Sequence, residues 1–318
     1  MPLHREVNDR RPNVQNAEIL RSSLGTGEID FSIVVPTYNR PLGLSHCLEA
    51  IASGAYPRSR YEVIVVDDGS EETLEPIVAP FLRSLNITLL RQRNSGPACA
   101  RNAGAREAGG TYLVFLDDDC RPDPGWLHAL GRKLDVNPLC AAGGKTVNGL
   151  AQNLFSTASQ DLIEYLYNYW NPDADDAAFV TSNNLVFPRI LFKQIGGFDT
   201  NFPFAAAEDR ELCDRWRSLH QRIVYAPEAL VFHYHELSLK TFLVQHFTYG
   251  RGAVIFHNIR KQRIRQRTEI SQRAFFRGLL YFAVTRKPGL RGIAVGMLIW
   301  LSQIVMVFGY LSRRYLGY

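Results

Sequence analysis

Short runs of apolar, mostly β-branched residues alternate with segments of helical spacing along the first part of the chain. The runs are FSIVV (31–35), YEVIVV (61–66), ITLLR (87–91) and YLVFL (112–116). Strands that are apolar at nearly every position are typical of a parallel sheet with both faces covered. The segments between them, such as RPLGLSHCLEAIASG, carry apolar residues on one helical face. The pattern therefore predicts an α/β fold with a doubly wound sheet and right-handed crossovers.

The pattern is less regular after residue 127, but it still predicts several elements. They are a strand at 139–147, a helix at 159–170, a strand and a helix that end at Gly196 and Gly197, a helix opened by Glu208 and Asp209, and a strand pair that ends at His233 and His235. On the helix that Glu208 and Asp209 open, Leu212, Trp216 and Leu219 have the spacing of an inward face. We expect these elements to complete a domain that extends to about residue 240.

The last part of the chain differs in charge and in hydrophobicity. Residues 292–311 are twenty uncharged, largely apolar positions, a length near the minimum for crossing a bilayer. From Lys240 to the end, the chain contains fourteen Lys and Arg residues but only one acid, Glu269, although the net charge of the whole chain is only +5. Arginines flank the apolar segment on both sides, which leaves open whether it spans a membrane, lies in its interface or docks on a partner. The pattern favours membrane association.

Composition indicates how the chain is divided into regions and in which cellular compartment it lies. The chain of 318 residues is 46% hydrophobic, and we expect a poorly ordered leader (1–30), a main domain (31–240) and a basic, hydrophobic helical region (241–318). The five cysteines are odd in number and include no Cys-x-x-Cys, and the polar leader does not resemble a signal peptide. These features indicate the cytoplasmic side of the cell membrane. Nucleic acid is not an expected partner, because no recognition motif accompanies the basic cluster RKQRIRQR.

Polar residues follow the predicted strands where each strand ends. Pro36, Thr37 and Tyr38 follow the first, Asp68 the second, and the acids Asp117, Asp118 and Asp119 the fourth. In doubly wound sheets, ligands bind beyond the carboxyl ends of the strands. Three adjacent acids repel one another unless a cation lies among them, and Mg²⁺ or Mn²⁺ is the first candidate. A solvated acidic turn is the alternative.

Five motifs, taken together, identify a family. In chain order they are IVVPTYNR, YEVIVVDDGS, NSGPACARNAGAREAGGTYLVFLDDD, GGFDTNF and EDRELCDR. Their order and spacing over about residues 31–240 resemble the inverting glycosyltransferases of family 2. The resemblance implies a GT-A fold, a Rossmann-like architecture of transferases that use nucleotide-diphospho-sugars. It also implies metal-dependent transfer of a sugar from a nucleoside diphosphate sugar, with UDP as the first candidate, to a hydroxyl acceptor in cell-surface polysaccharide or glycolipid synthesis.

The resemblance also implies roles for the residues at the strand ends. The donor-binding set would be Pro36, Thr37, Tyr38, Asp68, Arg101, Asp117 and Asp118. Within it, Asp68 would accept a hydrogen bond from the imide N–H of the base, although a role as a helix N-cap is the alternative. Arg101 would lie near the nucleotide or pair with Asp68 or Asp117. Asp118 would point into the structure or position the loop.

The metal ligands implied by the resemblance are Asp119, Asp117 and His233, holding Mn²⁺ or Mg²⁺. Side chains at i and i+2 leave a strand end in the same direction, so Asp117 and Asp119 can address one site. The alternation along the strand does not separate His233 from His235, and either can be an ordinary hydrogen-bonded histidine.

An inverting transfer requires a base that takes the proton of the acceptor hydroxyl. The resemblance assigns this role to Asp209, with Glu208 as the reserve because one of two adjacent acids at a helix start can serve as a cap. The segment LSLKTFLVQHFTYGRGA is similar to a stretch of membrane-associated members and would place Tyr249, Gly250 and Arg251 near the diphosphate.

Other classes fit the motifs less well. A phosphatase of the haloacid dehalogenase type would carry its Asp-x-Asp after the first strand, and a receiver module would show a different spacing. A dinucleotide-dependent oxidoreductase would carry Gly-x-Gly-x-x-Gly after the first strand, and this chain does not. The remaining alternative is a catalytically silent homologue that serves as a membrane-associated scaffold.

Overall fold

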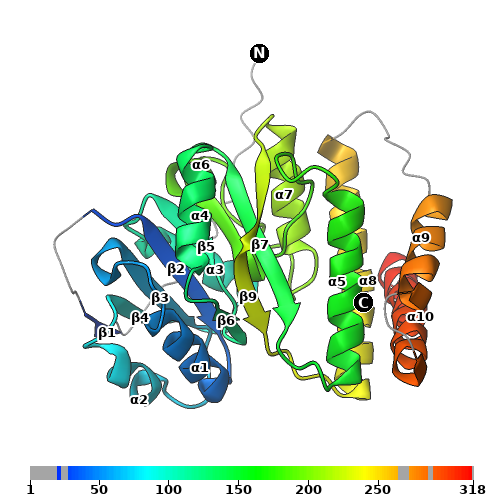
Figure 1. The fold of residues 1–318 in the computed structure, drawn as a ribbon, viewed down its shortest axis with the longest axis horizontal. Coiled ribbons are helices and arrows are strands. Elements are labelled where there is room, and N and C mark those ends of the chain that lie inside the picture. The colour runs from blue at the N-terminus through cyan, green and yellow to red at the C-terminus, as the bar shows by residue number, and fades with distance from the viewer. Residues whose placement is uncertain (1–19, 23–27, 264–271, 286–288, 317–318) are drawn as a thin grey trace.

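The computed structural model describes residues 20–22, 28–263, 272–285 and 289–316, and these residues form one mixed sheet flanked by helices (Figure 1). The strands are β1 (Leu20–Arg21), β2 (Phe31–Thr37), β3 (Tyr61–Asp67), β4 (Ile87–Arg91), β5 (Tyr112–Phe115), β6 (Cys120–Pro122), β7 (Ala141–Asn148), β8 (Leu185–Pro188) and β9 (Ile223–His233). Within the described ranges their order in the sheet is β1-β4-β3-β2-β5-β8-β7-β9-β6.

The helices lie on both faces of the sheet and at one side of it. They are α1 (Pro41–Ala52), α2 (Glu75–Val78), α3 (Pro97–Glu107), α4 (Trp126–Asp135), α5 (Leu154–Trp170), α6 (Arg189–Gln194), α7 (Glu208–Ser218), α8 (Leu239–Arg263), α9 (Gln272–Thr285) and α10 (Gly289–Leu311). Short 3₁₀ turns occupy Arg58–Arg60, Ala79–Phe81 and Ser182–Asn184, and a π-helical turn at Ser312–Leu316 follows α10.

The four strands predicted from apolar runs form the parallel part of the sheet. β4, β3, β2 and β5 are neighbours in this order and all pair in parallel. The β2–β3 register sets Thr37 opposite Asp67, so the two strands end at the same edge. The predicted parallel sheet is therefore confirmed, together with its polar edge. Beyond β5 the sheet is mixed, because β8 runs antiparallel to both β5 and β7.

Alternate residues of β2 belong to two separate cores. Ile33 packs into a core with α1, α2 and α4, whereas Val34 packs into a core with α3, α6 and α7. Helix α3 approaches the sheet closely, since a Cβ on Gly104 would lie 2.4 Å from Cγ1 of Val34. Burial of a continuous apolar strand on both faces supplies the main favourable free energy for this arrangement.

Two expectations about the second half are wrong. The predicted strand pair ending at His233 and His235 is one strand, β9, whose pairing with β7 skips from Ala226 to Leu230. Leu219, predicted to face inward, is 52% exposed because α7 ends at Ser218. The other two residues of that predicted face, Leu212 and Trp216, are fully buried.

The C-terminal helices pack against α5 and share a core with it at one side of the molecule (Figure 1). Helices α8 and α10 cross in close contact, since a Cβ on Gly250 or on Gly309 would lie 2.0 Å from a backbone oxygen of the other helix. The helical segment Gly289–Leu316 is long enough to cross a membrane, and its most apolar window of 18 residues has a mean hydropathy of 2.0. One third of its most apolar window is buried inside the protein.

Most of the predicted leader lies outside the described residues. Within it, Leu20 and Arg21 form β1, which pairs antiparallel with β4 and forms the edge of the sheet. Ser22 follows and exchanges hydrogen bonds with the start of β4, including a 2.9 Å bond from its N–H to the carbonyl of Ile87. This part of the leader is therefore a strand of the sheet.

Candidate active site

The three acids 117–119 lie in the turn between β5 and β6. β6 pairs antiparallel with β9, and the register sets Cys120 opposite His233. The N–H of Tyr234 donates to the backbone carbonyl of Asp119 at 2.8 Å. Strand pairing therefore brings Asp119 beside the end of β9, although more than one hundred residues separate them in sequence.

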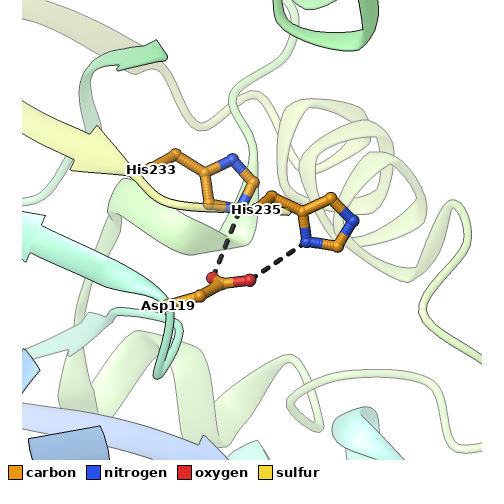
Figure 2. A group of neighbouring side chains, drawn as sticks. All are labelled: Asp119, His233 and His235. Carbon is orange, nitrogen blue, oxygen red and sulfur yellow. Dashed lines mark hydrogen bonds and ion pairs between the residues drawn. The ribbon is translucent and has the colours of Figure 1, made fainter. Parts of the chain in front are cut away.

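Asp119 contacts two histidines at this point (Figure 2). Its Oδ1 lies 3.2 Å from Nε2 of His233, and its Oδ2 lies 3.1 Å from Nδ1 of His235. One ligand atom from each of the three residues can be chosen so that all three atoms lie within 4.8 Å of one another. The histidine rings stack with centroids 5.2 Å apart. The structure thus brings Asp119 together with both histidines that the strand alternation could not separate.

The charges around Asp119 favour its ionised form. Burial alone raises the pKa of this carboxyl, but the charge of His233 and hydrogen bonds from His233 and His235 outweigh burial and hold the pKa well below its ordinary value. Arg40 contributes in the same direction, since its Nη1 lies 2.9 Å from Oδ2 of Asp119. A carboxylate that stays charged while nearly buried is a suitable ligand for a cation.

Asp118 points inward and organises the turn. Its Oδ2 accepts a hydrogen bond from Oγ1 of Thr37 at 2.7 Å, and its Oδ1 accepts one from Nη1 of Arg40 at 3.2 Å. Burial raises the pKa of Asp118 to about 6 even though Arg40 opposes the shift. Thr37, predicted to line the base pocket, therefore ties the end of β2 to the acidic turn.

Asp117 pairs with Arg101. Nη2 of Arg101 donates to Asp117 at 2.7 Å, and Nη1 of the same residue donates to Glu208 at 3.0 Å. The side chains of Arg101 and Glu208 are both 4% exposed. Of the two pairings predicted for Arg101, the structure shows the one with Asp117. Asp117 lies outside the group of Asp119, His233 and His235, so its role as a metal ligand stays a prediction.

Glu208 and Asp209 open α7 directly behind this bridge. Burial, and then repulsion from Asp209, raises the pKa of Glu208 to about 7. Burial also raises the pKa of Asp209, whose oxygens accept hydrogen bonds from the N–H of Arg210 at 2.7 Å and of Ser182 at 3.3 Å. The preceding residue, Ala207, has a φ of 71°, a left-handed conformation that is uncommon for alanine. Strained residues of this kind are enriched at functional sites.

Helix α8 closes the side of the site near the acid pair. Burial raises the pKa of Tyr249 to about 12, and the negative charges of Asp209 and Glu208 add to the shift. The Tyr249 hydroxyl also accepts a hydrogen bond from Nε2 of Gln245 at 2.6 Å. Tyr249 therefore lies near the acid pair, and its expected position beside the diphosphate stays a prediction.

Asp68 lies at the end of β3 and holds the loop that leads into α3. Its carboxylate accepts hydrogen bonds from Nε2 of Gln92 at 2.7 Å and from the N–H groups of Ser95 and Gly96 at 2.9 and 2.8 Å. The turn after β3 is capped instead by Asp67, which accepts from the N–H of Ser70. Asp68 is therefore a loop anchor in this structure, and base recognition stays a prediction.

The two other residues predicted for the base pocket sit at the end of β2. Pro36 belongs to the strand itself and pairs in register with Val66, while Tyr38 follows the strand and is 46% exposed. The sequence reasoning did not assign roles to Arg40 and Gln92. Arg40 could have been selected from the sequence as a site residue, because it follows the polar end of β2 in the motif IVVPTYNR.

Comparison with known proteins gives the family. The model of Glycosyl transferase family 2 matches residues 32–196. The hyaluronan synthase of Pasteurella multocida is 40% identical over 218 residues, which are 58% of this chain and 22% of that protein. The chain spans less than half the length of each of the first curated relatives that it matches.

Two solved structures resemble the whole described fold. The mannosyltransferase PcManGT from Pyrobaculum calidifontis, in complex with GDP-Man and Mn²⁺, has a TM-score of 0.64 at 17% identity and covers 96% of this chain and 92% of its own. TarS 1-349 from S. aureus, in complex with UDP-GlcNAc, has a TM-score of 0.52 at 18% identity, covering 91% and 92%. These likenesses show the GT-A fold alone. Because the family model covers more than half of its length, this chain belongs to glycosyl transferase family 2, which confirms the resemblance in its motifs and the expected enzyme class, a glycosyltransferase.

Proposed function

We propose that this chain is a metal-dependent inverting glycosyltransferase that moves a sugar from a nucleoside diphosphate sugar, with UDP as the first candidate, to a hydroxyl acceptor in polysaccharide or glycolipid synthesis. The observation that carries the proposal is one constellation at the sheet edge. Asp119 contacts two histidines, and Arg101 joins the neighbouring Asp117 to Glu208, the residue before Asp209.

Asp119, His233 and His235 would hold the metal. A carboxylate with two imidazoles fits Mn²⁺ better than Mg²⁺, because Mg²⁺ takes oxygen ligands almost exclusively. When bound, a divalent cation neutralises charge on the departing diphosphate. The low pKa of Asp119 keeps the carboxylate charged before the ion arrives. The solved complex of PcManGT with Mn²⁺ is consistent with this proposal.

Asp209 would be the base that takes the acceptor proton. Glu208 is committed to the buried pair with Arg101, whereas the described hydrogen bonds of Asp209 come from two backbone N–H groups. Burial raises the pKa of Asp209, and a raised pKa makes a carboxylate a stronger base. Arg101 then acts as a positioning residue, because it fixes Glu208 and Asp117 on either side of the site.

Asp68 would recognise the base of the donor. A carboxylate only accepts hydrogen bonds, which suits the imide N–H of uracil. Its Oδ1 already accepts two hydrogen bonds and its Oδ2 accepts one, so Oδ2 keeps a free lone pair in the contacts described. The complex of TarS with UDP-GlcNAc supports a uridine donor, whereas that of PcManGT with GDP-Man makes guanosine the alternative to test.

The C-terminal helices would hold the enzyme against the cytoplasmic face of a membrane, with α10 lying along the surface. Helix α8 packs closely along α10 and carries Arg251, Arg260 and Lys261. If α10 crossed the bilayer, these charges would be drawn toward hydrocarbon at a cost of several kcal/mol each. A helix that buries one apolar face in the interface avoids this cost.

Donor binding and transfer test the proposal separately. Thermal shifts with UDP, GDP and dTDP sugars, each with and without Mn²⁺, identify the donor. Asp119→Ala should abolish the Mn²⁺-dependent shift. Asp209→Asn should keep the shift but lose transfer by about a hundredfold or more. Asp135→Asn, at an exposed position on α4, is the matched control and should change neither. Normal transfer by Asp209→Asn would refute the base assignment.

A further inference from the structure

Arg40 is an arginine beside the candidate metal site that has no role in the reaction proposed above. Its Nη1 donates to Oδ2 of Asp119 at 2.9 Å and to Oδ1 of Asp118 at 3.2 Å. Asp118 is also held by the hydroxyl of Thr37, whereas Asp119 is the proposed metal ligand. One guanidinium nitrogen therefore joins the inward-pointing acid of the turn to the carboxylate that would hold the cation.

The backbone around Arg40 is fixed by neighbouring elements. The preceding residue, Asn39, has a left-handed φ of 53° and is tied to the turn after β3. Its N–H donates to Oγ of Ser70 at 2.9 Å, and its Oδ1 accepts from the N–H of Glu71 at 2.8 Å. The carbonyl of Arg40 accepts from the N–H of Leu44 in α1 at 3.0 Å. The side chain of Arg40, by contrast, is 49% exposed, so it can change partner while the backbone stays in place.

Most of the hydrogen-bonding capacity of Arg40 is unused. A guanidinium group carries five N–H donors. Among the residues that the structure describes, only Nη1 of Arg40 has acceptors, and Nε and Nη2 donate to none. Arg101, which also contacts the acidic turn, is different, because its side chain is 4% exposed and both of its Nη atoms donate to carboxylates. Arg101 is therefore a fixed bridge, whereas Arg40 has donors left for a ligand.

A metal ion at Asp119 would compete with Arg40 for the same carboxylate. Bonds from such ions to oxygen are about 2 Å long, and Nη1 of Arg40 lies 2.9 Å from Oδ2, so ion and guanidinium would lie within about 5 Å of each other. Two positive groups at this distance repel. Asp118 stays available to Arg40, because it lies outside the group of metal ligands. The diphosphate of a donor shares the ion, which brings phosphate oxygens within reach of the displaced guanidinium.

We propose that Arg40 is a donor-binding residue whose partner depends on the metal. It pairs with Asp119 before the cation binds, and it binds the diphosphate of the donor once the cation holds Asp119. The fork of guanidinium N–H groups matches phosphate oxygens, and Asp118 holds the side chain in both states. Metal and donor then favour each other's binding through Arg40 as well as through their direct contact. The inference rests on the proposed metal-dependent use of a nucleoside diphosphate sugar and adds a residue to that reaction.

Equilibrium dialysis of the full chain with radiolabelled UDP tests this role. The dissociation constant is measured without Mn²⁺ and with saturating Mn²⁺, and the ratio of the two values reports how strongly metal and nucleotide favour each other. The test variant is Arg40→Gln, which keeps a polar side chain but removes the charge. The control is Arg83→Gln, at an exposed position that precedes the start of β4. GDP takes the place of UDP if the thermal shifts select guanosine.

The ratio should fall on the order of tenfold in Arg40→Gln, because a charge-assisted contact to phosphate is lost only in the metal-bound state. Arg83→Gln should keep the wild-type ratio. An equal loss of UDP affinity with and without Mn²⁺ would overturn the proposal, since it would reflect charge in general. Tighter binding of Mn²⁺ alone shows that Arg40→Gln is folded and that the pair with Asp119 is gone. If Mn²⁺ does not strengthen nucleotide binding even in the wild-type protein, the proposed metal dependence itself fails, and the role of Arg40 with it.

Discussion

Burial of Glu208 leads to a prediction about how the free energy of unfolding changes with pH, and this prediction can be tested without knowing the substrates. Glu208→Gln removes the ionisable group but keeps the shape and an oxygen that can accept from Arg101. In the wild-type protein this residue is 3% exposed, and burial, followed by repulsion from Asp209, raises its pKa from 4.5 to about 7. The pH dependence of the unfolding free energy should therefore differ between the variant and the wild-type protein only over the pH range in which this carboxyl ionises.

The sign and the size follow from the two pKa values. A group whose folded pKa is raised stabilises the protein fully below its unfolded pKa, near 4.5, and loses that contribution as the pH rises through about 7. A difference of about 2.5 between the two pKa values corresponds to about 3 kcal/mol. The unfolding free energy of Glu208→Gln, minus that of the wild-type protein, should therefore increase by about 3 kcal/mol between about pH 4 and about pH 8.

Urea unfolding at a series of pH values, followed by tryptophan fluorescence, measures this difference. Trp216 is a suitable reporter because it is fully buried on α7, the helix that Glu208 opens. Glu228→Gln, at an exposed position on β9, is the matched control and should give a difference that is nearly constant with pH. A constant or falling difference for Glu208→Gln would refute the reasoning, because it would mean that the carboxyl is not held in its neutral form.

Two further predictions concern packing and metal affinity. Gly250→Ala should lower the unfolding free energy by about 1–3 kcal/mol, because its Cβ would lie 2.0 Å from the carbonyl oxygen of Met306. The control Gly131→Ala, in α4 and with no contact closer than 3.9 Å, should raise it by about 0.5–1 kcal/mol, and equal effects in urea unfolding would contradict the close helix contact. Arg40→Gln removes a positive charge 2.9 Å from Oδ2 of Asp119 and should tighten Mn²⁺ binding about fivefold in a titration followed by electron paramagnetic resonance. Unchanged or weaker Mn²⁺ binding would show that Arg40 does not compete with the metal.

The sequence predicted the first half of the fold well because each of its strands is a continuous apolar run that is buried on both faces. In the second half, β6 has only three residues and β8 only four. Segments this short carry little periodicity, and their antiparallel pairing depends on contacts between distant parts of the chain. The interrupted pairing of β9 with β7 likewise leaves no mark in the alternation, so it was taken for two strands.

The candidate site was predictable in its acids and only in part in their partners. The strand end singled out Asp119, since adjacent acids at such a place require a chemical reason, and the resemblance to family 2 singled out Glu208 and Asp209. The partners are set by packing, because the two carboxylates joined by Arg101 are 107 residues and 16 residues away from it. His235 lies beyond the end of β9, where side-chain alternation no longer fixes direction, so only the structure shows it beside Asp119.

The close packing of α8 has a mechanical consequence for the acid pair. A Cβ on Gly252 would lie 2.4 Å from the carbonyl oxygen of Ala206, which directly precedes the left-handed Ala207. Helix α10 in turn packs closely against α8 at Gly309. The C-terminal helices thus support the loop that precedes Asp209, and a chain cut near residue 240 should lose the position of this proposed base together with the proposed membrane contact.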